Sequence, residues 1–240
     1  MKPLKRNHLL IMSRHEDFFE RKALERYQKK NKKRLTNKDF TIFANSCVGA
    51  QIYRDLGLRF DTPLVGLYIT PEDFVKLMEK PEYWFKQPIF EEQLNLGFPV
   101  GLLGGIIRIF FRSDKSFKEA IERWNRRLER VHWDNIFVFL NPLEQDFGID
   151  KNFRNHICST NVVDQFLKLP YKNKVVVTNK KRLILSNVCV YMRRYEWLEY
   201  PPYIGIISCL SGKRIFDRYF DVVHWLNTGI IMKRPFIKRF

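Results

Sequence analysis

Short, continuous apolar runs alternate along this chain with segments whose apolar residues recur at helical spacing. The runs Phe40–Ala44, Pro63–Ile69, Asn135–Leu140 and Asn173–Thr178 have the length and composition of strands that are buried on both faces. Strands that alternate with helices in this way are typical of parallel sheets. The sequence therefore predicts an α/β domain over residues 39–230, in which a mostly parallel sheet carries helices on both faces to give three layers.

Capping signals mark two of the helices between these runs. Thr70 precedes Pro71 and two acidic residues, which favours a helix that begins at the proline. Ser116 stands three residues before Glu119, which is the spacing of a capping box. Each signal predicts a helix whose first turn lies directly after the Thr or Ser residue.

Three further segments complete the expected fold. Val100–Phe111 has the character of one strand or of a hairpin that turns at Gly104 and Gly105, and a last helix is expected over Arg214–Leu226. Residues 1–38 form a basic N-terminal extension with a helix over 13–34, and residues 231–240 form a basic tail.

The positive charge of the chain is concentrated at these two ends. The net charge is +17, of which residues 1–38 carry 13 Lys and Arg against 4 Asp and Glu, and the last ten residues add four cations and no acid. The nearly balanced body argues against a nucleic-acid partner, whereas basic ends suit anionic lipid head groups or simply a solvated surface. With no apolar stretch of membrane-spanning length and no signal peptide, the chain is expected in the cytoplasm, with a peripheral position at the inner membrane face as an option.

The cysteines and histidines do not form a metal-binding pattern. Cys47, Cys158, Cys189 and Cys209 lie far apart, with no CxxC pair among them, and the five histidines do not stand at ligand spacing. We expect free thiols and no metal.

Asn45, Ser46 and Cys47 follow the first expected strand and precede an expected helix from Gly49 to Leu56. In an open α/β sheet ligands bind at the carboxyl ends of the strands, and a thiol at a helix N-terminus is favoured as the nucleophilic thiolate. Cys47 is therefore the candidate nucleophile and Asn45 the candidate oxyanion donor. The competing interpretation is that Cys47 is a small buried apolar residue.

The same turn offers the candidate cofactor-binding residues Ser46 and Gly49, because a helix N-terminus attracts anions. A single glycine matches neither the dinucleotide fingerprint nor the P-loop, so a nucleotide site of either kind is unsupported.

His156 is the candidate general base. It follows the strand Asn135–Leu140 and is expected at the same sheet edge as Cys47, although an exposed loop histidine is the competing interpretation. His132 precedes that strand and is expected at the opposite edge. The aromatic and basic stretch 191–203 could serve as a nucleic-acid platform, but its two glutamates and its prolines favour a surface loop. A saccharide site is a competing interpretation, because such aromatic side chains also stack on sugar rings.

Several motifs together resemble a known family, the bacterial "domain of unknown function 1919" family. They are Asn45–Gly49 with Ile52–Phe60 and Thr62-Pro63, Pro71–Met78, Trp124–Arg127 with Arg130 and Trp133–Ile136, Leu169–Val176, and Tyr219–Asn227. The resemblance covers about residues 38–228 and implies an α/β fold and a role in exopolysaccharide or capsule biosynthesis, the label that members commonly carry.

The chain departs from the family pattern at two places. Ser46 and Ala50 replace an Asn and a Gly of the first motif, and a later Asp-Gly-Cys-Thr motif becomes His156–Thr160. Another capsule-related family, which binds coenzyme A, carries Gly-Asn-Cys at the end of its first strand, and Asn45–Cys47 is similar in position.

These observations lead to two functional hypotheses. The first is a transferase of surface-polysaccharide biosynthesis, an O-acyltransferase that uses acyl-coenzyme A and modifies a saccharide or a lipid-linked precursor, with Cys47, Asn45 and His156 in the roles given above. The alternative is a non-catalytic saccharide-binding or assembly protein at the cytoplasmic membrane face.

Overall fold

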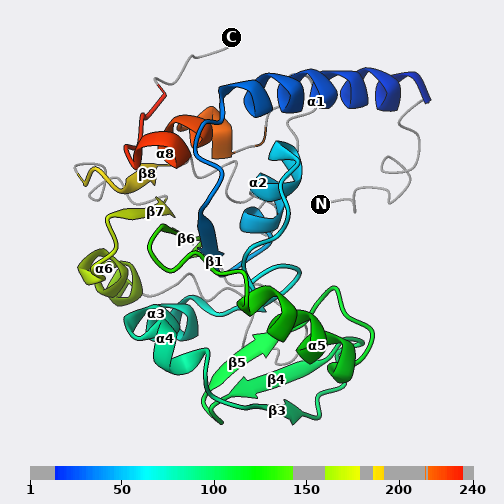
Figure 1. Ribbon diagram of the computed structural model, residues 1–240, viewed down its shortest axis with the longest axis vertical. Coiled ribbons are helices and arrows are strands. Elements are labelled where there is room, and N and C mark those ends of the chain that lie inside the picture. The colour runs from blue at the N-terminus through cyan, green and yellow to red at the C-terminus, as the bar shows by residue number, and fades with distance from the viewer. Residues whose placement is uncertain (1–13, 143–159, 179–185, 192–213, 215, 235–240) are drawn as a thin grey trace, which may run out of the picture.

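A computed structural model describes residues 14–142, 160–178, 186–191, 214 and 216–234, and within these ranges the chain forms two four-stranded sheets (Figure 1). In the first sheet all described neighbours are parallel, in the order β1-β6-β7-β8. Its strands are β1 (Thr41–Ala44), β6 (Ile136–Leu140), β7 (Asn173–Thr178) and β8 (Cys189–Tyr191). The apolar runs that predicted β1, β6 and β7 are confirmed as parallel strands.

The second sheet is antiparallel and has the order β2-β5-β4-β3. Its strands are β2 (Tyr68–Ile69), β3 (Ile89–Glu92), β4 (Val100–Leu103) and β5 (Ile107–Phe110). The hairpin alternative for Val100–Phe111 is confirmed, since β4 and β5 pair across a turn in which Gly104 and Gly105 have φ of 59° and 72°. Positive φ is the conformation that glycine adopts without steric cost.

The prediction that Pro63–Ile69 forms one long parallel strand is wrong. Only Tyr68 and Ile69 are extended, and they pair antiparallel with β5. Val65 N–H donates to the carbonyl of Pro63, and Gly66 has φ of 79°, so the first half of the run is a tight turn. The apolar composition of this run indicated that it is buried, but it did not indicate its backbone conformation.

The helices are α1 (Arg14–Arg34), α2 (Val48–Leu56), α3 (Pro71–Glu79), α4 (Pro81–Trp84), α5 (Phe117–Leu128), α6 (Thr160–Lys168) and α8 (Val222–Thr228), with a 3₁₀ turn, η4, at Phe216–Arg218. Thr70 and Ser116 cap α3 and α5 as predicted, because their hydroxyls accept from the N–H groups of Asp73 and Glu119. The last expected helix is divided instead into η4 and α8, and Asp221 caps α8.

Side chains of the parallel sheet divide between two apolar clusters. Alternate residues of β6 show this division: Phe137 and Phe139 pack with α2 and α8, whereas Val138 and Leu140 pack with α3 and α6. The second cluster also takes Ile109 of the antiparallel sheet. The α/β class is therefore confirmed. The predicted three layers around one mostly parallel sheet are not confirmed, because the chain forms a second, antiparallel sheet that the prediction did not include.

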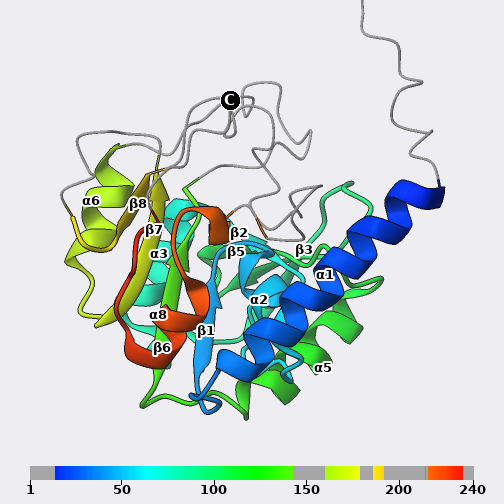
Figure 2. The same cartoon turned by 90° about the horizontal axis from the view of Figure 1, so that it is seen from above.

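The predicted N-terminal helix is present as α1, and it lies next to α2 (Figures 1 and 2). Gln28 donates to Asp55 of α2 with Nε2 to Oδ1 at 3.1 Å, and Arg34 pairs with Asp221. Asn31 and Leu35 are buried. The last two turns of α1 therefore belong to the folded body. None of the described helices combines the length and the apolar character of a membrane span.

A group of buried charges joins α1, α2 and the C-terminal segment. Asp55 and Arg214, separated by 159 residues in the chain, make two contacts of 2.6 Å with side chains that are 5% and 7% exposed. Arg234 lies 3.2 Å from Asp221 and 3.4 Å from Asp217. The first pair therefore ties α2 to the C-terminal segment, Arg234 holds that segment together, and the Arg34–Asp221 pair ties it to α1.

Asp217 is expected to make folding pH-dependent. Burial, with a smaller effect of Asp221, raises the pKa of its carboxyl from the ordinary 3.8 to about 6, although Arg234, the N–H of Val222 and the hydroxyl of Tyr27 act in the opposite direction. Because the folded state holds this proton more tightly than the unfolded state, this group's contribution to stability falls as pH rises from about 4 to 6. Asp217→Asn should therefore become more stable relative to wild type across that interval.

Urea denaturation at pH 4, 5, 6 and 7 measures this difference. Asp134→Asn, at an exposed site, is the control and should track wild type at every pH. If the Asp217→Asn and wild-type curves also run parallel, the assignment is contradicted.

Candidate functional site

The side chain of Asn45 fastens three strand ends together at the carboxyl edge of the parallel sheet. Its Oδ1 accepts from the N–H of Asn141, which follows β6, at 2.8 Å. Its Nδ2 donates to the carbonyl of Asn141 at 2.8 Å and to the carbonyl of Ile69, the end of β2, at 3.3 Å. The residue is fully buried, so these bonds form out of contact with water. Asn45 thus joins the parallel sheet to the antiparallel one.

This geometry favours a positioning role for Asn45 over the predicted oxyanion role. A primary amide has two N–H donors, and both are directed at backbone carbonyls. A bound oxyanion would have to displace one of these bonds.

Cys47 lies where the sequence predicted it, at the residue directly before helix α2. Its backbone is in the helical region, with φ of −61° and ψ of −9°, and its carbonyl accepts from Gln51 N–H. The thiol makes no capping hydrogen bond and is half-buried, so it is not fully enclosed in the core. Cys189, which begins β8, is buried and also free. Cys158 and Cys209 lie outside the described residues.

Ser46 and Gly49, the candidate cofactor-binding residues, are both buried. A Cβ atom on Gly49 would lie 3.2 Å from the Cβ of Ala44 and 3.5 Å from Cγ2 of Ile42. Glycine at this position allows α2 to pack closely on β1, which is a structural reason for the residue besides any contact with a cofactor.

Sequence reasoning passed over Gln51, which lies one helical turn after Cys47. Its Oε1 is buried and has no hydrogen-bond partner among the described residues. Residues four apart share a helix face, so this amide and the thiol lie on the same side of α2. Helical spacing from Cys47 was the signal that would have identified it.

The predicted base, His156, lies outside the described residues. Within the described ranges, no group of three or more His, Cys, Asp or Glu residues is arranged to hold a metal ion. His132 lies as predicted at the amino end of β1, where its N–H donates to Thr41 Oγ1 at 2.8 Å.

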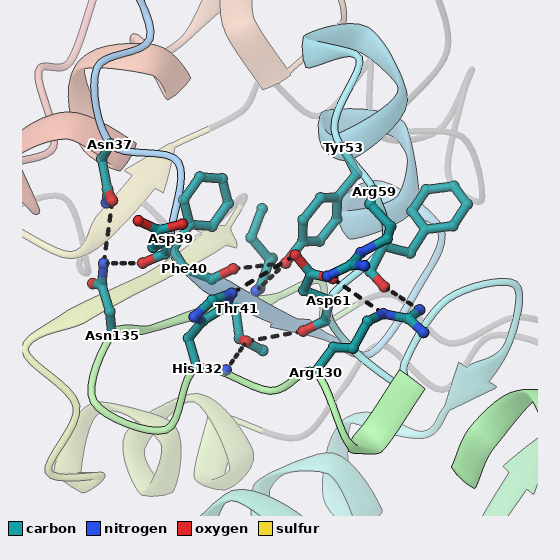
Figure 3. A network of polar contacts seen from close by, with 12 residues as sticks. Asn37, Asp39, Phe40, Thr41, Tyr53, Arg59, Asp61, Arg130, His132 and Asn135 are labelled. Atoms are coloured by element: carbon teal, nitrogen blue, oxygen red, sulfur yellow. Dashed lines mark hydrogen bonds and ion pairs between the residues drawn. The ribbon is translucent and has the colours of Figure 1, made fainter. Parts of the chain in front are cut away.

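A polar network surrounds this amino end (Figure 3). Cys47 follows the carboxyl end of β1, so the network lies at the opposite edge of the sheet. Asp61 Oδ1 is 3.0 Å from Nε of Arg59 and 3.2 Å from Nε of Arg130, and its carbonyl accepts from Thr41 Oγ1 at 2.9 Å. Asn135 donates to the carbonyl of Asp39. The network links the loop after α2 to the loop before β6.

Comparison with known proteins places the chain among its relatives. A protein of Haemophilus influenzae named "Uncharacterized protein" is 30% identical over 216 residues, which are 90% of this chain and 94% of the relative. Residues 17–227 match the family described as Domain of unknown function (DUF1919). Neither description mentions polysaccharide, so that part of the resemblance stays a prediction. The chain belongs to the bacterial DUF1919 family, as its motifs predicted.

Proposed function

We propose that this protein is a transferase of surface-polysaccharide biosynthesis that moves an acyl group through Cys47 to a saccharide or a lipid-linked saccharide precursor. The observation that carries the proposal is the half-buried thiol of Cys47, which lies at the start of α2 and makes no capping hydrogen bond to the helix. The N–H groups of a first helical turn have no partner within the helix and favour a thiolate or an oxyanion beside them. The hydrogen bonds of Asn45 fix the end of β1, and this holds the adjacent Cys47 in position.

The proposed chemistry has two balanced steps. The Cys47 thiolate attacks the carbonyl carbon of an acyl-coenzyme A, a C–S bond forms, and the coenzyme A thiolate leaves. A saccharide hydroxyl then attacks the new thioester, its proton passes to a base, and the Cys47 thiolate leaves as the ester forms. His156 remains the candidate base for that proton.

The roles of the neighbouring amides follow from their contacts. Asn45 positions Cys47 by fastening the strand end, since both of its amide hydrogens are taken. Gln51, whose buried Oε1 accepts from no donor in the described part of the chain, takes the place of Asn45 as the candidate side-chain amide beside the acyl group, because its Nε2 can donate to an acyl oxygen. Ser46 and Gly49 line the same turn as candidate contacts to the cofactor.

Replacement of the thiol tests the proposal. In a host that lacks the native gene copy, Cys47→Ala is expected to abolish acylation of the surface polysaccharide, because the nucleophile is absent. Cys189→Ala also removes one thiol and should leave acylation intact. Thermal melting of both variants serves as the control for folding. Normal acylation by folded Cys47→Ala protein would contradict the catalytic role of Cys47.

The exposed face of α1 supports peripheral attachment to an anionic membrane surface as part of this proposal. Seven exposed cations lie between residues 21 and 33, with Glu25 as the acid of that segment: Arg21, Lys22, Arg26, Lys29, Lys30, Lys32 and Lys33. Basic residues near an anionic surface contribute about 1 kcal/mol each.

Sedimentation with phosphatidylserine-containing vesicles measures this attachment. Lys29→Glu with Lys33→Glu should weaken binding by about tenfold or more. Lys115→Glu with Lys118→Glu, the same charge change at exposed sites near the start of α5, should weaken it much less. Equal losses in the two double variants would refute a role for α1.

The second candidate is a saccharide-binding or assembly protein without catalysis. It is favoured by the contacts of Asn45 and Gly49, since hydrogen bonds to the strand ends account for Asn45 and close packing of α2 on β1 accounts for Gly49. Retained polysaccharide output in Cys47→Ala, together with saccharide binding by the purified variant, would support this candidate over the first.

A further inference from the structure

Three arginines of helix α5 and one in the turn that follows it continue a single helical face. Arg123, Arg126, Arg127 and Arg130 follow the i, i+3, i+4, i+7 spacing that places side chains together on a helix. This face meets the loop between α2 and β2. Arg130 Nη2 donates to the carbonyl of Phe60 at 2.7 Å, as Arg127 Nη1 does to the carbonyl of Val65 at 2.9 Å.

Two carboxylates near this face are each committed to an arginine. Asp61 holds Arg59 and Arg130, at 3.0 and 3.2 Å. Asp114, whose side chain is 4% exposed, lies 3.1 Å from Arg123. Within this set of five guanidinium groups and two carboxylates positive charge is in excess, and the nearby Glu119, Glu122 and Glu129 form no ion pair with the five in the described part of the chain.

That excess rests on Arg126 and Arg127. Within the described residues neither forms an ion pair with a carboxylate. The Arg127 guanidinium lies 5.3 Å from the centre of the Phe60 ring, in cation–π contact, and uses only Nη1 on the carbonyl of Val65. Its Nε and Nη2 donors have no protein acceptor in the described part of the chain.

The surroundings of Arg127 are unfavourable to an uncompensated cation. Burial and the positive charges of Arg123, Arg130 and Arg126 together lower the pKa of its guanidinium to about 10, although Asp114 acts in the opposite direction. A doubly charged anion placed here would offset both the burial and the repulsion. Guanidinium groups suit such an anion because their planar N–H pairs match phosphate oxygens.

We propose that Arg123, Arg126 and Arg127 on α5 bind the phosphoryl group of a small phosphorylated ligand. The ring of Phe60 and the carbonyl of Val65 hold the Arg127 fork in place for the phosphate oxygens. The site lies with the amino-end network and not with Cys47, so it does not depend on the proposed acyl transfer. Inorganic phosphate, a sugar phosphate and a nucleoside diphosphate share the chemistry that this site recognises.

Isothermal titration of the full chain with pyrophosphate, inorganic phosphate, a hexose 1-phosphate and a nucleoside diphosphate tests the proposal at low ionic strength. We expect binding of at least one of these probes beyond the effect of sodium chloride at equal ionic strength. Arg126→Gln and Arg127→Gln should each weaken it about tenfold, the loss of one charge-assisted contact. The tightest probe identifies the source of the phosphate.

Lys118→Gln removes one positive charge from an exposed position of the same helix and is the matched control. It should change the Kd by less than about twofold, as expected for a cation outside the site. Arg126 is exposed, so its variant tests the site even if Arg127→Gln loses the fold. Absence of binding by all four probes, or an equal loss in Lys118→Gln and Arg126→Gln, would overturn the proposal.

Discussion

Asp55→Ala is expected to lower the free energy of unfolding by about 3–5 kcal/mol, the range for breaking a buried ion pair. Asp55 accepts two hydrogen bonds of 2.6 Å from Arg214, and the two side chains are 5% and 7% exposed. The substitution keeps a buried cation while it removes the carboxylate that faces it. It also removes the acceptor for Gln28, which helps to hold α1.

Chemical denaturation of purified protein measures this loss. Asp134→Ala removes an exposed aspartate and should change the free energy of unfolding by less than about 0.5 kcal/mol. Asp55→Leu combined with Arg214→Met should recover much of the lost stability, because an apolar pair has no charge to bury. A loss below about 1 kcal/mol in Asp55→Ala would show that the pair is not buried as described.

Asn45→Ala is expected to lower the free energy of unfolding by about 3 kcal/mol, since it removes three hydrogen bonds to buried backbone groups at roughly 1 kcal/mol each. The groups concerned are the N–H and carbonyl of Asn141 and the carbonyl of Ile69. Because those groups lie at the ends of β6 and β2, both sheets should be weakened.

The same denaturation experiment with Asn95→Ala, at an exposed loop position, provides the control and should show a change near zero. If Asn45→Ala is as stable as wild type, its amide does not fasten the strand ends. The result also decides how activity data are interpreted, because a variant that loses the strand end loses function without any part in catalysis.

The sequence predicted the elements whose signals are local. Continuous apolar runs indicated β1, β6 and β7, and the caps at Thr70 and Ser116 indicated where α3 and α5 begin. These features depend only on residues that are close in sequence, so a sequence pattern is sufficient to predict them.

The antiparallel sheet depends on pairings that no local pattern records. β2 has two residues, and β3 alternates too little between buried and exposed positions to be distinguished from a loop. Gly66, with its positive φ, converts half of an apolar run into a turn. The sheet order follows from contacts between these pieces, which is why the prediction did not include it.

The sequence predicted the position of the candidate site in the fold but not the contacts of its side chains. Strand β1 followed by α2 put Cys47 at the expected edge. The partners of Asn45 are 24 and 96 residues away in sequence, so the commitment of its amide to the strand ends could not be inferred from the motif. The same is true of Asp55 and Arg214, which sequence reasoning did not single out.

The most direct test of the proposed acyl transfer is intact-mass and peptide mass spectrometry of the protein after incubation with acetyl-coenzyme A and longer acyl-coenzyme A species. We predict one acyl group per chain, bound to Cys47, lost on treatment with hydroxylamine, and absent from Cys47→Ala but present in Cys189→Ala. Folded wild-type protein that binds acyl-coenzyme A without acylation of Cys47 would contradict the proposed acyl transfer. Equal acylation of the wild-type protein and of Cys47→Ala would also contradict it.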